Sequence, residues 1–356
     1  MISAVAERNI LALPDGHCRE QGRRTMPFRS LMLCVLGIGA ALWATAMSAL
    51  GATDAGSILP PAGQALQGKA PFRFAVVGDS RGNMRAFEKV LARIRLDSVA
   101  LILHGGDIVE RCDPQQYEWV LHELGEENLT VPFCPIPGNH DVDEGASDAE
   151  SRYRLYTRAF GPRQYWFSYA NALFVGFDDA TAHCAPEDLS WLDRTLATQR
   201  DSYRACFVFM HVPPRDPMAG SRQGHALREG TEALMNILKR HRVTAVFASH
   251  IHSYLTDNME GIPIYITGGG GATLEPSCKS HHYLLCRVEA DGSFTEQKID
   301  VPTGLDTDYP EYLLRVKILP DAPAGAGVLL CVAGVIGVIV LLRRRKLSLR
   351  AQQHQQ

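Results

Sequence analysis

Short apolar runs alternate with amphipathic segments along the central part of this chain. Runs at 72–77, 99–103 and 131–136 have the length and composition of buried strands, and each leads into a loop that carries Asp or Asn. Between them, residues 83–96 space apolar side chains as a helix does, and Pro114 begins a second such segment. Three strand–loop–helix units in succession predict a layered α/β domain.

The alternation continues further along the chain. We predict a hairpin at 164–177, helices at 186–199 and 226–240, strands at 206–210, 243–248 and 262–267, and a last hairpin at 281–301 around Asp291-Gly292. Residues 52–70 are rich in Gly, Ala, Pro and Gln, which is typical of a linker, and residues 302–321 have little pattern. We therefore expect one folded domain at 71–301, preceded by a linker and followed by a stalk.

Two long segments without charge flank this domain. Residues 31–50 follow a group of arginines and precede small residues, which is the layout of a signal peptide or of a retained signal anchor in a leader that spans 1–51. Met26 would begin a signal of ordinary length, so Met1 and Met26 both remain open as the start.

The second uncharged segment, 322–342, is long enough to cross a bilayer and ends in Arg343-Arg344-Arg345-Lys346. The alternative, a buried core helix, rarely lacks polar residues on every side. By the positive-inside rule the basic tail at 343–356 is cytoplasmic. We expect the folded domain to be extracytoplasmic, either periplasmic or extracellular, and anchored to the cell membrane.

Composition and charge narrow the function only slightly. The chain has 356 residues, 46% apolar and 21% charged, with a net charge of −3, so nothing indicates a nucleic acid as partner. Six of its nine cysteines fall in the part expected to be exported. An oxidising compartment permits disulfides there, and we favour Cys278 with Cys286 among the possible pairs, although buried free thiols are also common.

The candidate chemistry lies at the ends of the predicted strands. The residues that share this position are carboxylates, an amide and imidazoles, namely Asp79, Asp107, Asn139, His140, Asp141, His211, His250 and His252. Ligands of layered α/β folds gather outside the carboxyl ends of strands, so these distant residues can converge. Mixed oxygen and imidazole donors suit Mn, Fe or Zn better than metals that prefer thiolate.

In its order, the set resembles the calcineurin-like metallophosphoesterases, whose fold is a two-sheet β-sandwich flanked by helices. The resemblance covers about residues 72–290, and Gly138-Asn139-His140-Asp141 is its most specific part. It implies two divalent metal ions bridged by Asp107. The implied roles are Asp79 and His252 on the first ion; Asn139, His211 and His250 on the second; and His140 as an uncoordinated proton donor, with Asp141 to orient it.

These residue types fit hydrolysis of a phosphate ester. Two ions roughly 3.5–4 Å apart can share one carboxylate, generate hydroxide near neutral pH and hold phosphoryl oxygens. A free imidazole can then protonate the leaving oxygen. The substrate implied is a phosphate mono- or diester. Asn139 and His140 would also contact its phosphate group.

The first motif departs from the family pattern. The family has Asp-x-His, whereas this chain has Asp79-Ser80-Arg81, and arginine has no lone pair for a metal. Glu110 could replace the lost ligand, which would leave Arg81, and with it Asn83, to contact substrate. Alternatively, Glu110 is a solvated loop residue and the first site is weak or empty. The second departure is Ser249 in place of Gly, which we expect to cost little.

We therefore expect an exported, membrane-anchored, metal-dependent phosphoesterase. Two alternatives stay open. One is a hydrolase with a single metal ion held by Asn139, His211 and His250, and the other is a catalytically inactive binding module of the same fold on the cell surface. The glycine run 268–271 is equally compatible with a segment close to the site and with a flexible turn.

Overall fold

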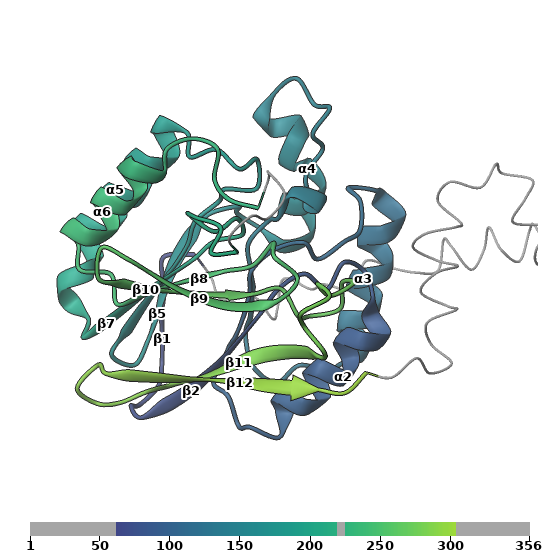
Figure 1. The fold of residues 1–356 in the computed structure, drawn as a ribbon, viewed down its shortest axis with the longest axis horizontal. Coiled ribbons are helices and arrows are strands. Elements are labelled where there is room, and N and C mark those ends of the chain that lie inside the picture. The colour runs from purple at the N-terminus through teal and green to yellow at the C-terminus, as the bar shows by residue number, and fades with distance from the viewer. Residues whose placement is uncertain (1–61, 219–224, 304–356) are drawn as a thin grey trace, which may run out of the picture. The chain divides into compact units, whose positions relative to one another are not determined.

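Two β-sheets packed face to face form the centre of the molecule (Figure 1). The computed structural model describes residues 62–218 and 225–303. In spatial order, the larger sheet consists of β1 (Ala65–Leu66), β5 (Tyr165–Tyr169), β6 (Ala172–Gly176), β7 (Ala205–Phe209), β8 (Ala245–Ala248), β10 (Ile262–Thr267) and β9 (Tyr254–Met259). The smaller sheet consists of β12 (Phe294–Val301), β11 (His281–Val288), β2 (Phe72–Val77), β3 (Ile102–His104) and β4 (Phe133–Pro135).

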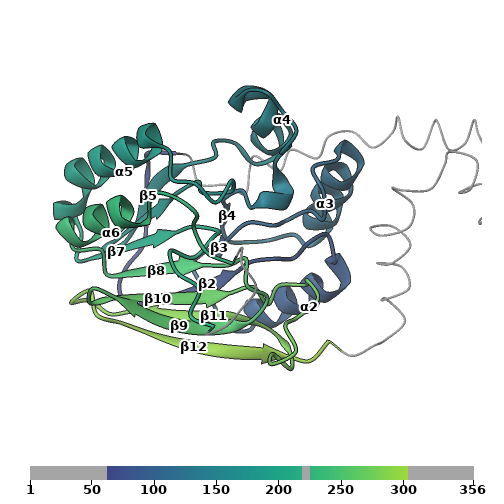
Figure 2. The ribbon, with the colours of Figure 1, turned by 45° about the horizontal axis from the view of Figure 1, so that its top comes forward.

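Helices cover the outer faces of both sheets (Figure 2). The helices α5 (Pro186–Gln199) and α6 (Thr231–Arg240) pack on the larger sheet through leucines such as Leu192 and Leu234. Helices α2 (Met84–Arg95), α3 (Pro114–Glu126) and α4 (Ala149–Phe160) pack with the smaller sheet, and short 3₁₀ turns, η2 (Asn139–Asp141) and η3 (Arg200–Ser202), complete the described elements. The two-sheet sandwich flanked by helices is thus confirmed.

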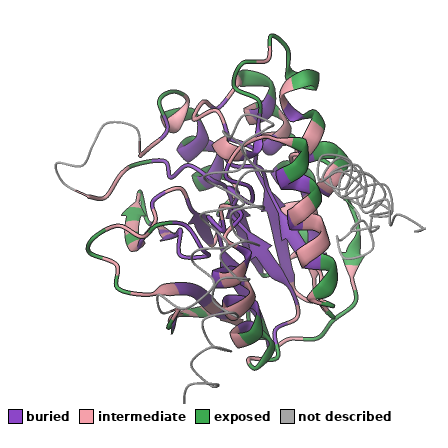
Figure 3. Ribbon diagram, turned by 90° about the vertical axis from the view of Figure 1, so that its right-hand side faces the viewer, coloured by how far each residue is buried: buried purple, intermediate pink, exposed green. Residues whose placement is uncertain are grey.

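The strand β2 is buried on both faces, which explains why its residues are apolar except for the exposed Arg73. Phe74 points between the sheets, where its ring centroid lies 5.2 Å from that of Phe174, whereas Ala75 and Val77 belong to the cluster beneath α2. Both faces of β2 are therefore buried, which Figure 3 shows for the central strands as a whole. Replacing Phe74 by Ala would cost about 3–5 kcal/mol of folding free energy.

Parallel pairing brings the polar loops to one edge of the sandwich. β2, β3 and β4 are mutually parallel in one sheet, and β6, β7 and β8 in the other. The carboxyl ends of parallel neighbours lie at the same edge, so the loops after β2, β3, β4, β7 and β8 start there together. The candidate metal-binding residues in these loops therefore lie at this edge of the sandwich.

The element predictions hold for most of the domain, with three omissions. α4 was not predicted, although Asp148 caps it through the N–H of Ser151 and Gly161 ends it with a φ of 86°. β9 is an edge strand that pairs only with β10, and β1 is two residues long. β1 also corrects the linker boundary, because Ala65 and Leu66 pair with β5 and so belong to the folded domain.

The two segments predicted to contact the membrane, 31–50 and 322–342, lie outside the described residues, as do the tail and nearly all of the stalk. Within 62–218 and 225–303, none of the helices has both the length and the apolar character that a bilayer span requires.

The favoured disulfide is not formed in this structure. Cys278 and Cys286 are both free thiols, as are the other four cysteines of the described part. Cys286 points into the core between the sheets, whereas Cys278 lies in the loop before β11. An extended strand advances about 3.3 Å per residue, so β11 carries the two residues well beyond the Cα separation of about 7 Å that a disulfide allows.

Candidate metal centre

Several residues of the candidate site have an uncommon backbone conformation. Asp79, Arg81, Asp107 and His250 are left-handed, with φ of 57°, 49°, 56° and 67°. In residues other than Gly this conformation costs energy and persists where the surroundings impose it, most often at functional sites. Neighbouring loops impose it here, because the N–H of Asp79 donates to Gly106 O at 2.9 Å and the N–H of Arg81 donates to Asp107 O at 2.8 Å.

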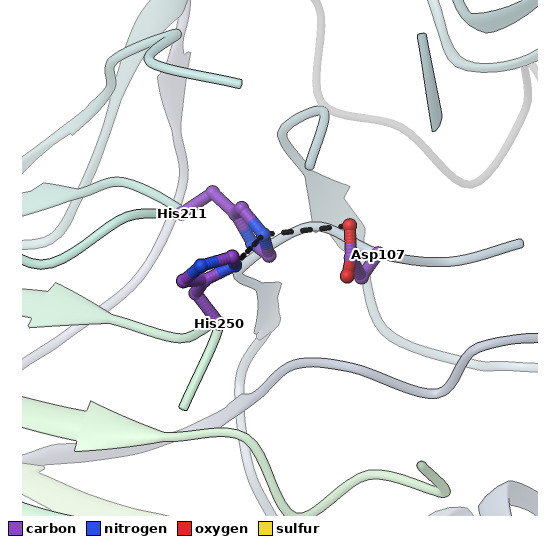
Figure 4. A group of neighbouring side chains, drawn as sticks. All are labelled: Asp107, His211 and His250. Carbon is purple, nitrogen blue, oxygen red and sulfur yellow. Dashed lines mark hydrogen bonds and ion pairs between the residues drawn. The ribbon is translucent and has the colours of Figure 1, made fainter. Parts of the chain in front are cut away.

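One cluster of possible metal ligands consists of Asp107, Asn139, His211 and His250. We call it the second ligand group, because these residues were expected on the second ion. Ligand atoms of Asp107, His211 and His250 all lie within 4.8 Å of one another, and Figure 4 shows the three side chains pointing together. His211 Nε2 lies 3.0 Å from Asn139 Oδ1, 3.1 Å from His250 Nδ1 and 3.4 Å from Asp107 Oδ1. Residues from the loops after β3, β4, β7 and β8 thus meet at one point.

The other cluster of possible metal ligands, here called the first ligand group, consists of Asp79, Asp107 and His252. Their ligand atoms also lie within 4.8 Å of one another, and His252 Nε2 is 3.4 Å from Asp79 Oδ1. Asp107 belongs to both groups, as expected of a bridging carboxylate. Asp79 and Asp107 are buried and the side chain of His252 is 19% exposed, the same pattern as in the second group, where Asp107 and His211 are buried and His250 is partly exposed.

The protons of the two histidines show that both groups fit a cation. His211 Nδ1 lies 2.8 Å from Gly105 O and His252 Nδ1 lies 2.8 Å from Thr273 O, so each Nδ1 donates to a carbonyl. Each neutral ring then turns the lone pair of Nε2 toward carboxylate or amide oxygens, which are also acceptors. Asp79 Oδ1 is buried and lies 3.4 Å from His252 Nε2, and no closer hydrogen-bond partner is found for it among the described residues. Convergent lone pairs of this kind require a proton or a metal ion between them.

The pKa shifts of the same groups also indicate that the site favours a positive charge. Burial opposes protonation of His211, but Asp107, Asp79 and Asp179 outweigh it and raise the pKa of His211. For Asp79, burial works the other way, and the hydrogen bond and charge of His252 lower its pKa below the ordinary value. Both shifts have one cause: the cluster stabilises positive charge placed among its carboxylates.

Arg81 and Glu110 pair with each other. Arg81 Nε and Nη2 donate to the two Glu110 carboxylate oxygens at 3.0 and 2.9 Å, and the side chains are only 16% and 10% exposed. Glu110 is in neither group of possible metal ligands found in the described part of the chain. The structure therefore places Glu110 on Arg81, and of the two interpretations left open for Glu110 it supports neither a metal ligand nor a solvated residue.

His140 lies beside the ligand groups without joining them. Its Nδ1 is 2.6 Å from Glu110 O, so that nitrogen donates to the carbonyl, and its Nε2 is 3.9 Å from Asp107 Oδ2. The side chain is 29% exposed. An imidazole fixed through Nδ1, with Nε2 near the bridging carboxylate and open to solvent, has the geometry of a proton donor to a substrate oxygen.

Asp141 does not contact the ring of His140, which corrects its expected role. Its buried carboxylate accepts the backbone N–H groups of Ile108, Val109 and Gly138 at 2.8–3.0 Å. Burial, together with the charge of Asp107, raises the pKa of Asp141 to about 7 in spite of these hydrogen bonds. Asp141 thus joins the Asp107 loop to the Asn139–His140 turn, and the Glu110 carbonyl is what orients His140.

Asn83 also differs from its expected role. Its Oδ1 caps α2 at the N–H of Ala86, and its Nδ2 donates to Gly271 O at 2.8 Å. Both polar atoms are therefore committed to the protein, and the predicted substrate contact gains no support. The glycine run does pass close to the site, because a Cβ on Gly268 would stand 2.9 Å from Asp79 Oδ2.

Ser249 fits its position, as expected. Its φ is not positive, and its hydroxyl donates to Thr267 O at 3.1 Å in a fully buried setting. Gly78 and Gly105 make room for it, because a Cβ on either would come within 2.1 Å of the Ser249 hydroxyl oxygen.

Asp179 is a site residue that was not predicted from the sequence. It follows β6, and its two carboxylate oxygens accept the N–H of His211 at 2.8 Å and of Val212 at 2.9 Å. Burial raises its pKa to about 7, although His211 lowers it. The available signal was the same as for the other site residues, an acidic residue immediately after an apolar run.

Comparison with known proteins identifies the class. A model of the calcineurin-like phosphoesterase family matches residues 72–254, about half of the chain. The chain belongs to the calcineurin-like phosphoesterases, and its fold and ligand groups are of the kind that this resemblance implied.

Individual relatives lie in two branches of that superfamily. The chain is 28% identical to purple acid phosphatase 22 of Arabidopsis thaliana over 58% of this chain and 51% of the relative. It is 22% identical to a protein named probable cyclic nucleotide phosphodiesterase of Fibrobacter succinogenes, over 50% and 67% of the two chains. A purple acid phosphatase structure from yellow lupin superposes with a TM-score of 0.50 at 16% identity, covering 65% of this chain and 54% of that one, which shows the fold. The chain spans about half the length of the purple acid phosphatases it matches.

Proposed function

We propose that this protein hydrolyses phosphate mono- or diesters at a metal centre formed by the two ligand groups. The observation that carries the proposal is the convergence of imidazole, amide and carboxylate lone pairs around Asp107 from five separate loops, its own included. Membership of the family supports the reaction class, and the names of the relatives include both phosphatases and phosphodiesterases. When bound, divalent ions supply polarisation of phosphoryl oxygens and a lowered pKa for water.

The protein's own side chains would then bind and protonate the substrate. Glu110 engages Nε and Nη2 of Arg81, and Nη1 has no hydrogen-bond partner among the described residues, so it can donate to a phosphoryl oxygen. Asn139 can donate through its amide nitrogen while its oxygen faces His211. His140 Nε2, held by the Nδ1 contact with Glu110 O, delivers the proton to the leaving oxygen.

The direct test is hydrolysis of p-nitrophenyl phosphate and bis(p-nitrophenyl) phosphate by the full-length chain with added Mn²⁺. We expect turnover of at least one substrate, loss with a chelator and recovery with Mn²⁺. The ratio of the two rates distinguishes a monoesterase from a diesterase. If neither ester is hydrolysed with Mn²⁺, Fe²⁺ or Zn²⁺ while the chain still binds the metal, the inactive binding module is the correct alternative.

We further propose that the domain is extracytoplasmic and tethered to the cell membrane by 322–342, with a cytoplasmic tail. The support is the uncharged length of that segment and the basic residues that follow it. A chain carrying a C-terminal epitope should stay in membranes at alkaline pH, and external protease should remove the domain but leave the epitope. Release of the intact chain by alkaline washing would refute the anchor.

A further inference from the structure

The Arg81–Glu110 ion pair lies where the family pattern has a metal-ligating histidine. It is fixed on both sides: the guanidinium makes two hydrogen bonds to the carboxylate, and the backbone of Arg81 is held to Asp107 O. The pair is mostly withdrawn from solvent, with 16% and 10% of the two side chains exposed. It is therefore an ordered part of the first half of the site.

We propose that this ion pair makes the two metal positions unequal, so that the second ligand group holds its ion tightly and the first holds its ion weakly and exchangeably. The inference rests on the proposed metal-dependent function and adds how the site is loaded: one resident ion, and one that depends on the metal concentration around the protein.

The number of ligands is the first reason. The second group offers four protein ligands, from Asp107, Asn139, His211 and His250. The first offers three, from Asp79, Asp107 and His252, one of them shared with the second group. Arginine cannot supply the missing one, because a guanidinium has five donors and no lone pair. An ion in the first position must complete its coordination with solvent or substrate.

The engagement of Glu110 is the second reason. Both of its oxygens already accept charge-assisted hydrogen bonds from Arg81, and such bidentate pairs are among the strongest side-chain contacts. Moving the carboxylate to a metal ion would leave a largely buried guanidinium without its partner. Glu110 is therefore kept away from the first ligand group by Arg81.

Charge is the third reason. A guanidinium keeps its proton in proteins, so Arg81, two residues after Asp79 and paired with Glu110, places a fixed positive charge beside the first group. It neutralises part of the negative charge that would attract a divalent ion to Asp79 and Asp107. The second group has His211 and His250 in that place, whose neutral rings add ligands without adding charge.

Binding of Mn²⁺ alone to the metal-stripped, full-length chain tests the inference. By equilibrium dialysis we expect one ion bound tightly and a second at least about tenfold more weakly, the usual scale for losing a contact around a metal. Paramagnetic resonance at one equivalent should show isolated Mn²⁺. In Arg81→His, which restores the missing ligand, both ions should bind with similar affinity and give a spin-coupled pair. Two equal sites in the unaltered chain would overturn the inference, as would an unchanged Arg81→His.

A double variant decides what Glu110 does. If Glu110 only holds Arg81, the gain in Arg81→His persists in Arg81→His/Glu110→Gln. Loss of the gain in the double variant would make Glu110 the ligand and overturn the inference. Arg287→His serves as the matched control, because Arg287 lies in β11 and pairs with Glu289 at the surface, outside both groups, and it should bind as the unaltered chain does.

Two further variants assign the tight ion even if Arg81→His does not fold. His211→Ala should lose the tight ion and His252→Ala should keep it, and the reverse result would overturn the inference. None of these measurements needs turnover. A chain that binds ions unequally but hydrolyses no ester would refute the proposed function alone, and an active chain with two equal ions would refute this inference alone.

Discussion

The two halves of the site share a carboxylate but are built differently. In the second ligand group the imidazole of His211 is fully buried, and both its ring and its backbone are held, by Gly105 O and by Asp179. In the first group His252 is partly exposed, and Arg81 occupies the position of a ligand. The second group is thus held on both sides of its central histidine, whereas the first lacks one ligand of the family pattern. The difference teaches that a family's ligand pattern can persist while the surroundings of its two metal positions diverge.

Removing the shared residue should erase the difference between the halves and have the largest effect. In Asp107→Asn both groups lose their shared charged ligand, so we expect activity to fall by roughly 10⁴-fold or more, because both ions lose their bridge and metal activation of water fails. Hydrolysis of the two nitrophenyl esters measures the loss. The Asn side chain keeps the shape, so unchanged circular dichroism would attribute the effect to the metal centre. Activity within tenfold of the unaltered chain would mean that Asp107 bridges nothing.

His140→Ala should separate chemistry from metal binding. The ring lies outside both groups, so Mn²⁺ stoichiometry should stay unchanged while turnover falls by about 10²–10⁴-fold, the range for a lost general acid. The decisive control is the leaving group: an ester of an acidic alcohol needs little protonation and should lose less activity than an alkyl ester. Equal losses for both esters would contradict the role as proton donor.

Asp179→Asn should weaken the second group only. Asp179 holds the His211 loop through two backbone N–H groups, and its amide variant keeps one acceptor oxygen and loses the other. We expect the affinity for the tightly bound Mn²⁺ to fall about 10–100-fold, as for other contacts that orient metal ligands, while the weakly bound ion is unaffected. Equilibrium dialysis measures both. Weakening of the first ion position instead would break the distinction between the two halves.

Much of this architecture could be predicted from the chain because each ligand follows an apolar run. Buried parallel strands are apolar, and their carboxyl ends lie at the same edge of the sheet. The sequence alone therefore predicted that Asp79, Asp107, His211 and His250 lie together. β1 and β9 escaped prediction because edge strands need only one partner and little burial, and β9 alternates only between half-buried and exposed positions.

The partners of individual side chains could not be predicted in the same way. Glu110 was a candidate to replace the lost ligand, yet its oxygens bind Arg81, and Asp141 follows His140 directly, yet its carboxylate binds the loop of Ile108 and Val109. In both cases the choice depends on which donor reaches the carboxylate in three dimensions. Spacing along the chain fixes the neighbourhood of a polar group, and the loops around it fix the partner.

The smallest expected effect concerns β3, the strand that carries Asp107 and so supports both halves alike. His104 is fully buried against Phe87 and Phe133, neither ring nitrogen has a hydrogen-bond partner among the described residues, and burial lowers its pKa to about 4. The unfolded chain binds this proton near pH 6.5 and the folded chain does not. The stability that depends on neutral His104 is therefore present above pH 6.5 and is lost as the pH falls toward 4.

The variant His104→Leu has no proton to bind at this position. Its free energy of unfolding should therefore fall by about 1–3 kcal/mol less than that of the unaltered chain when the pH is lowered. Urea unfolding at pH 7.5 and pH 5 measures it as the difference between the two chains, and parallel curves would show that His104 does not titrate as burial requires. Because β3 serves both ligand groups, any change in Mn²⁺ affinity in this variant should be the same for the two ions, whereas the Arg81 and Asp179 variants change one ion and spare the other.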